Sequence, residues 1–279
     1  MKLSSTSFLN YVSNYISYNL EYIIFSILTV ALIILIAHRS WEGFFTESLG
    51  INQLDAIIYI NLENRGDRKD LLLKELSALN TNMSKVHKVS GIYMPKNGHK
   101  GCIQSHILAL NMIKLNQPQW SRVLILEDDA ELTEEPAEFN KILSQAIDKL
   151  DTIDPDWNVL MLATAWKVIS PADMPERQAL EIYNPQGERI PLALQRLKSA
   201  TTASAYIVKA SYVDEILKLF DKCNGNLKPD RLNENNHEPW ALDQQWRSLQ
   251  ERDRWYCLDK DLVKQRAIWS TTMSQSHKE

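Results

Sequence analysis

The stretch SRVLILEDDA, residues 121–130, places three consecutive carboxylates directly after a run of apolar side chains. A short run rich in Val, Leu and Ile is typical of a strand buried on both faces of a sheet. Ligands of open α/β sheets bind at the carboxyl ends of strands, where Glu127, Asp128 and Asp129 would lie. The repulsion among these acids has two explanations. Either a divalent cation with oxygen ligands is bound and could hold a diphosphate, or the acids form a solvated strand end before an acidic helix start.

On either side of this stretch, strand-length apolar runs alternate with stripes of helical spacing. Further runs lie at 55–61, 157–163 and 203–208, and helical stripes lie at 72–79, 107–115, 139–147 and 213–220. This alternation favours an α/β sheet with helices on both faces. Two long stretches, about 169–200 and 221–240, are expected to be loops, and long loops of compact domains are commonly lids or binding loops.

The composition is that of an ordinary globular protein and excludes several classes of function. The 279 residues include 31 Lys and Arg against 35 Asp and Glu, and the sequence has no run of basic residues that could bind nucleic acid. Cys102, Cys223 and Cys257 are too few for a disulfide framework and lack metal-binding spacing. The sequence also lacks the glycine-rich dinucleotide motif, the P-loop and the H-E-x-x-H zinc motif.

Residues 22–37, YIIFSILTVALIILIA, carry no charge and predict a membrane anchor. As a helix they would rise about 24 Å, slightly less than a typical hydrocarbon core and suited to a thin membrane. A buried core helix rarely lacks a polar face over this length, and a cleaved signal peptide would need a basic start and a small-residue cleavage site. We expect a tail over 1–21, a transmembrane anchor over 22–38, a stem over 39–54 and one folded domain over 55–279.

A polar segment follows the first predicted strand. The sequence IIYINLENRGDRKDLLLKEL, 57–76, leads through a turn into a helix that is expected to begin near Asp67. Asn61 could contact a base or a ribose, and Arg65 and Arg68 could bind phosphate or carboxylate in bidentate fashion. The alternative is a plain strand–turn–helix unit in which Asp67 caps the helix.

Two later segments carry histidines, carboxylates and aromatic rings. In GHKGCIQSHILAL, 98–110, Ser105 and His106 are expected on the first turn of a helix, where adjacent residues point in different directions and do not form a nucleophile–base pair. In NHEPWALDQQW, 236–246, Glu238 and Asp243 lie among tryptophans. That arrangement suits a sugar site, but it also suits a core helix with Trp anchors.

The order of these segments resembles that of glycosyltransferase family 25, the group of lipopolysaccharide-type and procollagen-type galactosyltransferases. The resemblance covers about 55–272 and rests on IYINLENRGDR (58–68), GCIQSH (101–106), LILEDDA (124–130), TTASAYIV (201–208), LDQQW (242–246) and LVKQRAIWS (262–270). It implies a GT-A-like nucleotide-sugar-binding fold, a mixed α/β sheet with helices on both faces, behind one N-terminal transmembrane helix. The catalytic domain would then span 55–279.

The resemblance also implies a donor and a cofactor. A sugar such as galactose would pass from a UDP-sugar to a glycan, lipid-linked or protein hydroxyl, with Mn²⁺ or Mg²⁺ present. Asp129 would be the main metal ligand, Glu127 or Asp128 would contact the metal or the ribose, and His277 would complete the metal shell. The turn that holds Asn61, Arg65 and Arg68 matches the family's nucleotide-contacting turn.

The family's best-known members invert configuration at the anomeric carbon, which requires a carboxylate to act as general base on the acceptor hydroxyl. Asp243 matches the family's late aspartate and is the first candidate, and Glu238 is the second. The sequence departs from the family pattern at Lys100, where an acid is common, and at Thr271, where an aspartate is usual.

Two other hypotheses stay open, and the departures motivate the first of them. The first is a catalytically silent protein of the same fold that binds a nucleotide sugar. The second is metal-dependent phosphoryl transfer or hydrolysis, which lacks a P-loop and a second acidic strand end here.

The flanking charges of the anchor are nearly balanced and do not orient it. A lumenal domain is expected in a eukaryotic or viral host, and a cytoplasmic one in a bacterium. The sequon Asn82-Met83-Ser84 is compatible with a lumenal domain.

Overall fold

The computed structural model describes residues 22, 24–35, 50–169, 178–180, 182–183, 187–228 and 238–267. The chain divides into two compact units, Met1–Thr46 and Glu47–Glu279. In the first unit, residues 22 and 24–35 of the predicted anchor are helical with exposed side chains, and the rest of the anchor and the tail lie outside the described residues. Among the described residues, no helix combines the length and the apolar character that crossing a bilayer needs.

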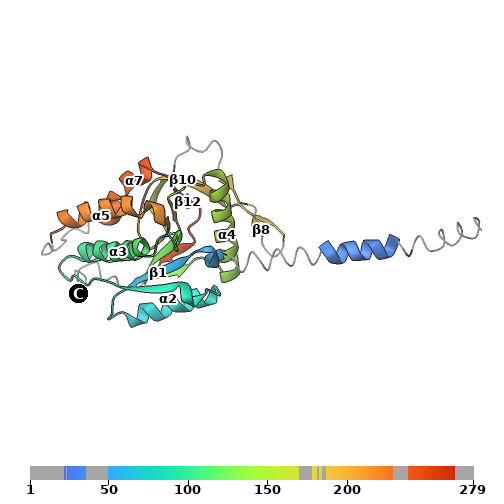
Figure 1. The fold of residues 1–279 in the computed structure, drawn as a ribbon, viewed down its shortest axis with the longest axis horizontal. Coiled ribbons are helices and arrows are strands. Elements are labelled where there is room, and N and C mark those ends of the chain that lie inside the picture. Colours follow the sequence, from blue (N-terminus) through green and yellow to red (C-terminus); the bar gives the residue numbers. More distant parts are fainter. Residues whose placement is uncertain are drawn as a thin grey trace, which may run out of the picture. The chain divides into compact units, whose positions relative to one another are not determined.

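A mixed nine-stranded sheet forms the centre of the second unit (Figure 1). Its strand order is β2-β1-β3-β11-β5-β12-β10-β6, with β7 beside β10. The strands are β1 (Ala56–Asn61), β2 (Val86–Ser90), β3 (Arg122–Glu127), β5 (Val159–Met161), β6 (Ala165–Ile169), β7 (Gln178–Ala179), β10 (Ala193–Thr201), β11 (Ala205–Lys209) and β12 (Trp255–Leu258). Two small ribbons pair β4 (Ala130–Leu132) with β13 (Val263–Gln265) and β8 (Ile182–Tyr183) with β9 (Arg189–Ile190).

The polar ends of three strands meet at one edge of the sheet. β1 lies between β2 and β3 and runs parallel to both, with Asn61 opposite Ser90 and Ile60 opposite Glu127. β11 runs antiparallel to β3 and to β5, so its first residues reach the same edge. Side chains that follow β1, β2 and β3 are thereby brought together, as expected for a ligand site in an α/β sheet.

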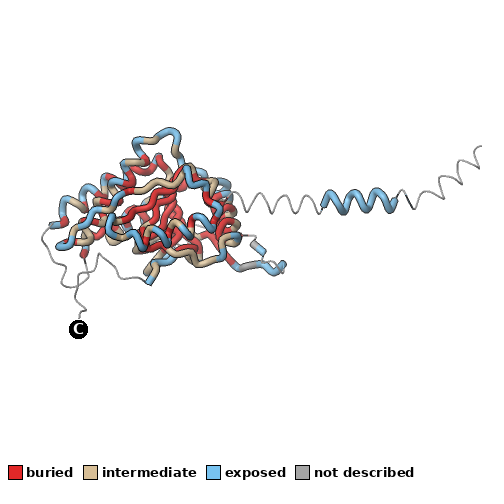
Figure 2. The backbone as a smooth tube through the Cα atoms, turned by 90° about the horizontal axis from the view of Figure 1, so that it is seen from below, coloured by how far each residue is buried: buried red, intermediate tan, exposed pale blue. Residues whose placement is uncertain are grey.

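Helices cover both faces of the sheet, as predicted. One face carries η1 (Gly50–Gln53), α2 (Gly66–Ala78) and α4 (Pro136–Ile153), and the other carries α3 (Gly98–Leu115), α5 (Val213–Asn226), α6 (Leu242–Gln245) and α7 (Arg247–Arg252). The short helices η2 (Met83–Lys85) and η3 (Ala210–Tyr212) precede β2 and α5. Alternate residues of β1 serve the two layers: Ile57 and Tyr59 pack with α2 and α4, and Ile58 and Ile60 pack with α3. The buried backbone in Figure 2 follows the sheet between these layers.

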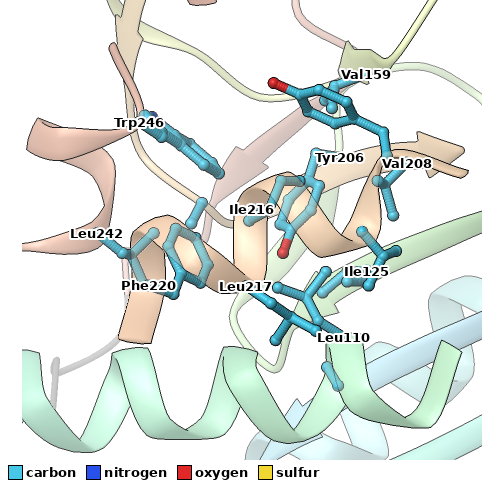
Figure 3. Close-up of a cluster of buried hydrophobic side chains, with 14 of the residues drawn as sticks. Leu110, Ile125, Val159, Tyr206, Val208, Ile216, Leu217, Phe220, Leu242 and Trp246 are labelled. Atoms are coloured by element: carbon cyan, nitrogen blue, oxygen red, sulfur yellow. The ribbon is translucent and has the colours of Figure 1, made fainter. Parts of the chain in front are cut away.

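Aromatic rings fill the layer between the sheet and α5 (Figure 3). The ring of Trp246 is fully buried and meets the edge of Tyr206, with centroids 5.5 Å apart. Its Nε1 donates a hydrogen bond to the Ala200 carbonyl oxygen at 3.1 Å. Of the two interpretations of 236–246, the core anchor is therefore the correct one for Trp246, and a sugar-stacking role for this ring is wrong.

The four predicted strands are confirmed to within two residues at their ends, but several others were missed. The stretch 169–200, expected to be a loop, contains most of β10, so that expectation is wrong. β10 was missed because Gln, Arg and Lys interrupt its buried positions, and β2 because its side chains are mostly half-buried. β12 is fully buried but only four residues long, between charged neighbours.

Three helix boundaries also differ from expectation. α3 begins at Gly98, so Ser105 and His106 lie about two turns inside it rather than on its first turn. α5 continues to Asn226, inside the predicted 221–240 loop, of which 229–237 lie outside the described residues. Residues 50–54 of the predicted stem pack with the folded unit, where Ile51 and Leu54 are buried, and 39–49 lie outside the described residues.

Candidate active site

A cavity of about 260 Å³ lies at the sheet edge where β1 and β3 end. Its walls come from the end of β1, the 91–94 segment, the start of α3, the 202–203 segment, α6, β13 and residues 127–129, which we call the acidic motif. The lining includes Arg68, Cys102, His106, Glu127, Asp128, Asp129, Thr202, Asp243 and Gln265. Each of the six segments on which the family resemblance rests contributes at least one lining residue.

The first side of the cavity is a buried cluster around Asp128. Arg68, from the first turn of α2, donates to Asp128 Oδ1 at 2.9 Å and to Asp129 Oδ2 at 3.3 Å. Asn61 Nδ2 donates to Asp128 Oδ2 at 2.8 Å and to the Arg65 carbonyl oxygen at 2.9 Å. The strand-end turn and the acidic motif, about sixty residues apart in sequence, therefore form one polar cluster.

Asp129 is less well satisfied than Asp128. Its Oδ1 is buried and accepts no hydrogen bond from the described residues. Burial raises the pKa of Asp129 to about 7, with the charge of Glu127 adding to the effect and Arg68 opposing it. A buried carboxylate oxygen without a donor is the kind of group that a cation or a protonated ligand would complete.

The Glu127 carboxylate is held in place by the buried side chain of His106. Its Oε1 lies 3.2 Å from His106 Nε2, and His106 Nδ1 lies 3.0 Å from the Tyr206 hydroxyl. Because a carboxylate only accepts, His106 Nε2 carries the proton of this hydrogen bond. Burial acts to raise the pKa of Glu127, but the hydrogen bond and charge of His106 outweigh it and hold that pKa below its usual value.

Asp243 lines the same cavity from a different element. It lies on the first turn of α6, and its Oδ2 accepts a hydrogen bond from the Thr202 backbone N–H at 3.1 Å. His99, on the first turn of α3, also lines the cavity, and burial lowers its pKa against the opposing charges of Asp243 and Glu238. Carboxylates from two separate elements, the end of β3 and α6, therefore line one cavity, and His99 lines it as well.

Gln265, from the last of the six segments, lines the cavity beside the acidic motif. β13 pairs with β4, which follows the acidic motif directly, and Gln265 lies opposite Ala130. The backbone N–H of Arg266 donates to the Asp129 carbonyl oxygen at 2.7 Å. This pairing fixes the backbone on which Asp129 sits.

The carboxylates fit a hard divalent cation better than the nearby sulfur-containing group does. Asp129 and Asp128 supply the oxygen donors that Mn²⁺ and Mg²⁺ prefer, and Asp129 Oδ1 has no other partner among the described residues. Potential ligand atoms of Cys102, His106 and Glu127 also lie within 4.8 Å of one another. Cys102 and His106 each already bond to Glu127 Oε1, however, and burial raises the pKa of the Cys102 thiol well above its usual value.

Two residues of the predicted nucleotide-contacting turn do not line the described cavity. Asn61 reaches the site through its hydrogen bond to Asp128. Arg65 binds Asp67 through two hydrogen bonds of 3.0 Å, and the helix carries no side-chain cap, so the expectation that Asp67 caps α2 is wrong. Of the three predicted side chains of this turn, only Arg68 faces the cavity.

Two further predicted residues are also missing from the described lining. Glu238 is buried and accepts from the Trp240 backbone N–H at 3.1 Å. His277 lies outside the described residues.

Several cavity residues were not predicted. His99, Tyr93 and Thr202 line the cavity, and Tyr93 has 58% of its surface exposed at the wall. Thr202 has a φ of +74°, and no sequence pattern predicts this backbone conformation. The side-by-side Ser105 and His106 offered a signal, but only the tertiary contacts show that His106 meets Glu127.

The departure from the family pattern at Lys100 has a structural explanation. Lys100 Nζ donates to the carbonyl oxygens of Asn224 and Leu227, each at 2.6 Å, and does not line the described cavity. A cation suits the carboxyl end of α5, where unpaired carbonyls and the helix dipole are negative. Thr271 lies outside the described residues.

Comparison with known proteins gives one family and several distant folds. None of the curated proteins matches the chain. A glycosyltransferase involved in the glycosylation of the major capsid of PBCV-1 is 11% identical with a TM-score of 0.34, covering 72% of this chain and 92% of the other. A mannose-1-phosphate geranyltransferase from Thermus thermophilus is 9% identical with a TM-score of 0.35, covering 77% and 75%.

The family comparison covers the centre of the site. The model of glycosyltransferase family 25, described as an LPS biosynthesis protein family, matches residues 94–233. This half of the chain contains the start of α3, the acidic motif and the 201–208 segment, all of which meet at the cavity. The chain belongs to glycosyltransferase family 25 and is a glycosyltransferase.

Proposed function

We propose that the chain is a membrane-anchored, metal-dependent transferase with a GT-A-like fold that moves galactose or a similar sugar from a UDP-sugar to a hydroxyl acceptor. The acceptor would be a glycan, a lipid-linked sugar or a protein side chain. One observation carries the proposal: each of six segments spread over 58–270 contributes to the lining of a single cavity, and carboxylates reach it from two separate elements, the end of β3 and α6. Nucleotide-sugar chemistry needs such a division, because the diphosphate and the acceptor hydroxyl require different groups.

The proposed reaction is an inverting displacement. The acceptor oxygen attacks the anomeric carbon, the bond from that carbon to the diphosphate oxygen breaks, and its electron pair leaves with UDP. Asp243 takes the proton of the attacking hydroxyl, because it lines the same cavity from α6, apart from the acidic motif in the chain. Glu238 remains the second candidate for this role, although its Oε1 already accepts a backbone hydrogen bond.

Asp129 would hold the cation, with Asp128 beside it, and Glu127 would contact the cation or the ribose. A bound Mn²⁺ or Mg²⁺ would neutralise charge on the departing diphosphate. Arg68 already balances Asp128 and Asp129 through its two short contacts. Asn61 orients Asp128, and Arg65 would contact the nucleotide from the same turn.

The remaining parts of the proposal concern location. Residues 22–38 would anchor the protein, 39–54 would include the stem, and the domain up to residue 279 would carry the catalytic cavity. The domain would face the lumen in a eukaryotic or viral host and the cytoplasm in a bacterium. The run of uncharged apolar residues at 22–37 supports the anchor.

A catalytically silent nucleotide-sugar-binding protein is the second candidate. The observation that favours it is the Arg68 guanidinium, which contacts both carboxylates that a cation would need. If this ion pair persisted in solution, the cation would have to compete with it. A silent protein would bind UDP-sugars without releasing UDP.

The test is UDP release by the purified full chain, with UDP-galactose, UDP-glucose and UDP-N-acetylglucosamine, with and without Mn²⁺. Free sugars and a hydroxylysine peptide serve as acceptors. We expect Mn²⁺-dependent UDP release that disappears in Asp129→Ala and in Asp243→Asn. The matched control is Asp70→Asn, whose side chain is 76% exposed on α2 and should leave the rate unchanged.

The other outcomes separate the alternatives. A thermal shift with UDP-sugars but no UDP release would support the silent protein. Release of inorganic phosphate instead of UDP would support phosphoryl transfer or hydrolysis. UDP release that is unchanged by chelation of metal would contradict the proposed cofactor.

A further inference from the structure

The short connector between β10 and β11, residues 202–204, has an unusual backbone. Thr202 has a φ of +74°. A β-branched residue in this left-handed region is a genuine outlier, because its Cβ crowds the backbone. Such conformations cost free energy and persist only where the surrounding structure holds them.

The connector is bonded at one end to the acidic motif and at the other to α6. At one end, the Ser204 carbonyl oxygen accepts from the Glu127 backbone N–H at 2.9 Å, and the Ser204 hydroxyl donates to Glu127 Oε2 at 3.5 Å. At the other end, the Thr202 N–H donates to Asp243 Oδ2 at 3.1 Å. The hydroxyls of Thr202 and Ser204 lie 3.3 Å apart and complete the link. The three residues therefore tie Asp243 to the end of β3.

The bond from Thr202 occupies only one oxygen of Asp243. Oδ2 accepts the backbone N–H, and Oδ1 accepts no hydrogen bond from the described residues. A carboxylate with one oxygen fixed by a backbone donor and the other open to a cavity is oriented to receive a proton. The left-handed backbone of Thr202 directs the N–H to Asp243 from within the cavity wall.

We propose that Thr202 is a positioning residue: its strained backbone holds the Asp243 carboxylate at a fixed place relative to the acidic motif. This inference rests on the proposed role of Asp243 as general base. Thr202 acts through Asp243, and the group that matters is its N–H rather than its side chain. A misplacement of the base by about 1 Å is enough to lower a rate by up to about 100-fold.

The test removes the N–H alone, by replacing the amide of residue 202 in the full chain with an ester. The matched control is the same replacement at Ala203, whose N–H donates no hydrogen bond to the described residues. With the UDP-sugar that the wild-type chain turns over, we expect the ester at 202 to lower kcat by about 10- to 100-fold while the donor KM stays unchanged. Thr202→Ala keeps the N–H and should lower kcat less than the ester at 202 does.

A second measurement checks the backbone conformation without using activity. Thr202→Gly and Thr202→Ala both lose the hydroxyl and the γ-methyl group, but only glycine adopts positive φ without strain. We expect the glycine variant to melt about 2–4 °C above the alanine variant. An alanine variant as stable as the glycine variant would overturn the left-handed conformation and the inference with it.

The outcomes distinguish the inference from the proposed function. Wild-type turnover with an unaffected ester at 202, or equal losses from the esters at 202 and 203, would overturn the inference alone. A parallel rise in donor KM would assign Thr202 a structural role and also overturn it. Full turnover by Asp243→Asn would overturn Asp243 as the general base and the inference with it, whereas no turnover by the wild-type chain would overturn the proposed function itself.

Discussion

Arg68 balances the charge of the acidic motif at the scale of a single residue. Its guanidinium is 4% exposed and contacts Asp128 and Asp129 at 2.9 and 3.3 Å. Replacing Arg68 with Met leaves two buried carboxylates without their cation, and we expect a loss of about 3–5 kcal/mol in unfolding free energy. The measurement is urea unfolding without divalent metal. We also expect Mn²⁺ to stabilise this variant more than the wild-type chain, because the cation can replace the guanidinium.

Arg65→Met is the matched control for this prediction. Arg65 lies three residues away, and its partner Asp67 has 58% of its side chain exposed. A solvent-exposed ion pair contributes about 1 kcal/mol or less. Equal losses in the two variants would contradict the assigned role of Arg68.

The raised pKa of Asp129 predicts that the stability of the folded state depends on pH in an unusual way. Burial raises its folded pKa to about 7 from an ordinary 3.8, so between these values the folded state binds a proton that the unfolded state has lost. The stability of the folded state therefore falls as pH rises through this window and is flat above it. Asp129→Asn removes the ionisation, so without metal its Tm should exceed that of the wild-type chain by several degrees more at pH 8 than at pH 5. A Tm difference that does not change with pH would show that ionisation of Asp129 does not destabilise the folded state.

At the scale of elements, the contact between α3 and the 91–94 segment shapes one wall of the cavity. A Cβ on Gly101 would lie 2.4 Å from the Ile92 carbonyl oxygen. The Ser105 hydroxyl holds the same segment by accepting the Ile92 N–H at 2.8 Å. Only glycine allows α3 to approach this closely, because a Cβ at this position would collide with the cavity wall.

Gly101→Ala should push the 91–94 segment away from α3. We expect a loss of about 1–3 kcal/mol in stability, as for other overpacked sites, and a higher KM for the donor because Ile92, Tyr93 and Met94 line the cavity. Thermal unfolding and donor kinetics measure the two effects. Gly66→Ala is the control: no atom lies within 4 Å of its added Cβ, and alanine favours helix, so this variant should be neutral or slightly stabilised.

At the scale of the whole molecule, the unit Glu47–Glu279 contains the complete sheet and both of its helical layers. Its first described residues belong to the core, because Ile51 and Leu54 are buried and the Ile51 N–H donates to Asn140 Oδ1 at 2.9 Å. A fragment that starts at residue 47 should therefore fold and melt close to the full chain. A fragment that starts at residue 56 loses two buried side chains and should be less stable by at least about 3 kcal/mol. Equal melting of the two fragments would place 47–55 outside the folded unit.

Part of the fold could be predicted because the pattern of burial is visible in the chain. β1, β3 and β11 are buried on both faces and appear as continuous apolar runs, and α4 and α5 show clear helical stripes. β10 and β12 could not be predicted in the same way. β10 mixes charged with buried positions, and β12 is short, so each is a strand only because its neighbours supply the hydrogen bonds.

The amino-acid sequence by itself determined the α/β class, the acidic motif at the end of a strand and the family to which the chain belongs. These follow from local patterns and from the order of short segments. Only the tertiary structure decided which side chains meet: Arg68 with Asp128, His106 with Glu127, and Asp243 with the strained Thr202. The reason is physical. Such contacts join residues 21 to 60 positions apart, and their partners depend on sheet order and on the path of a connector, which no local pattern encodes.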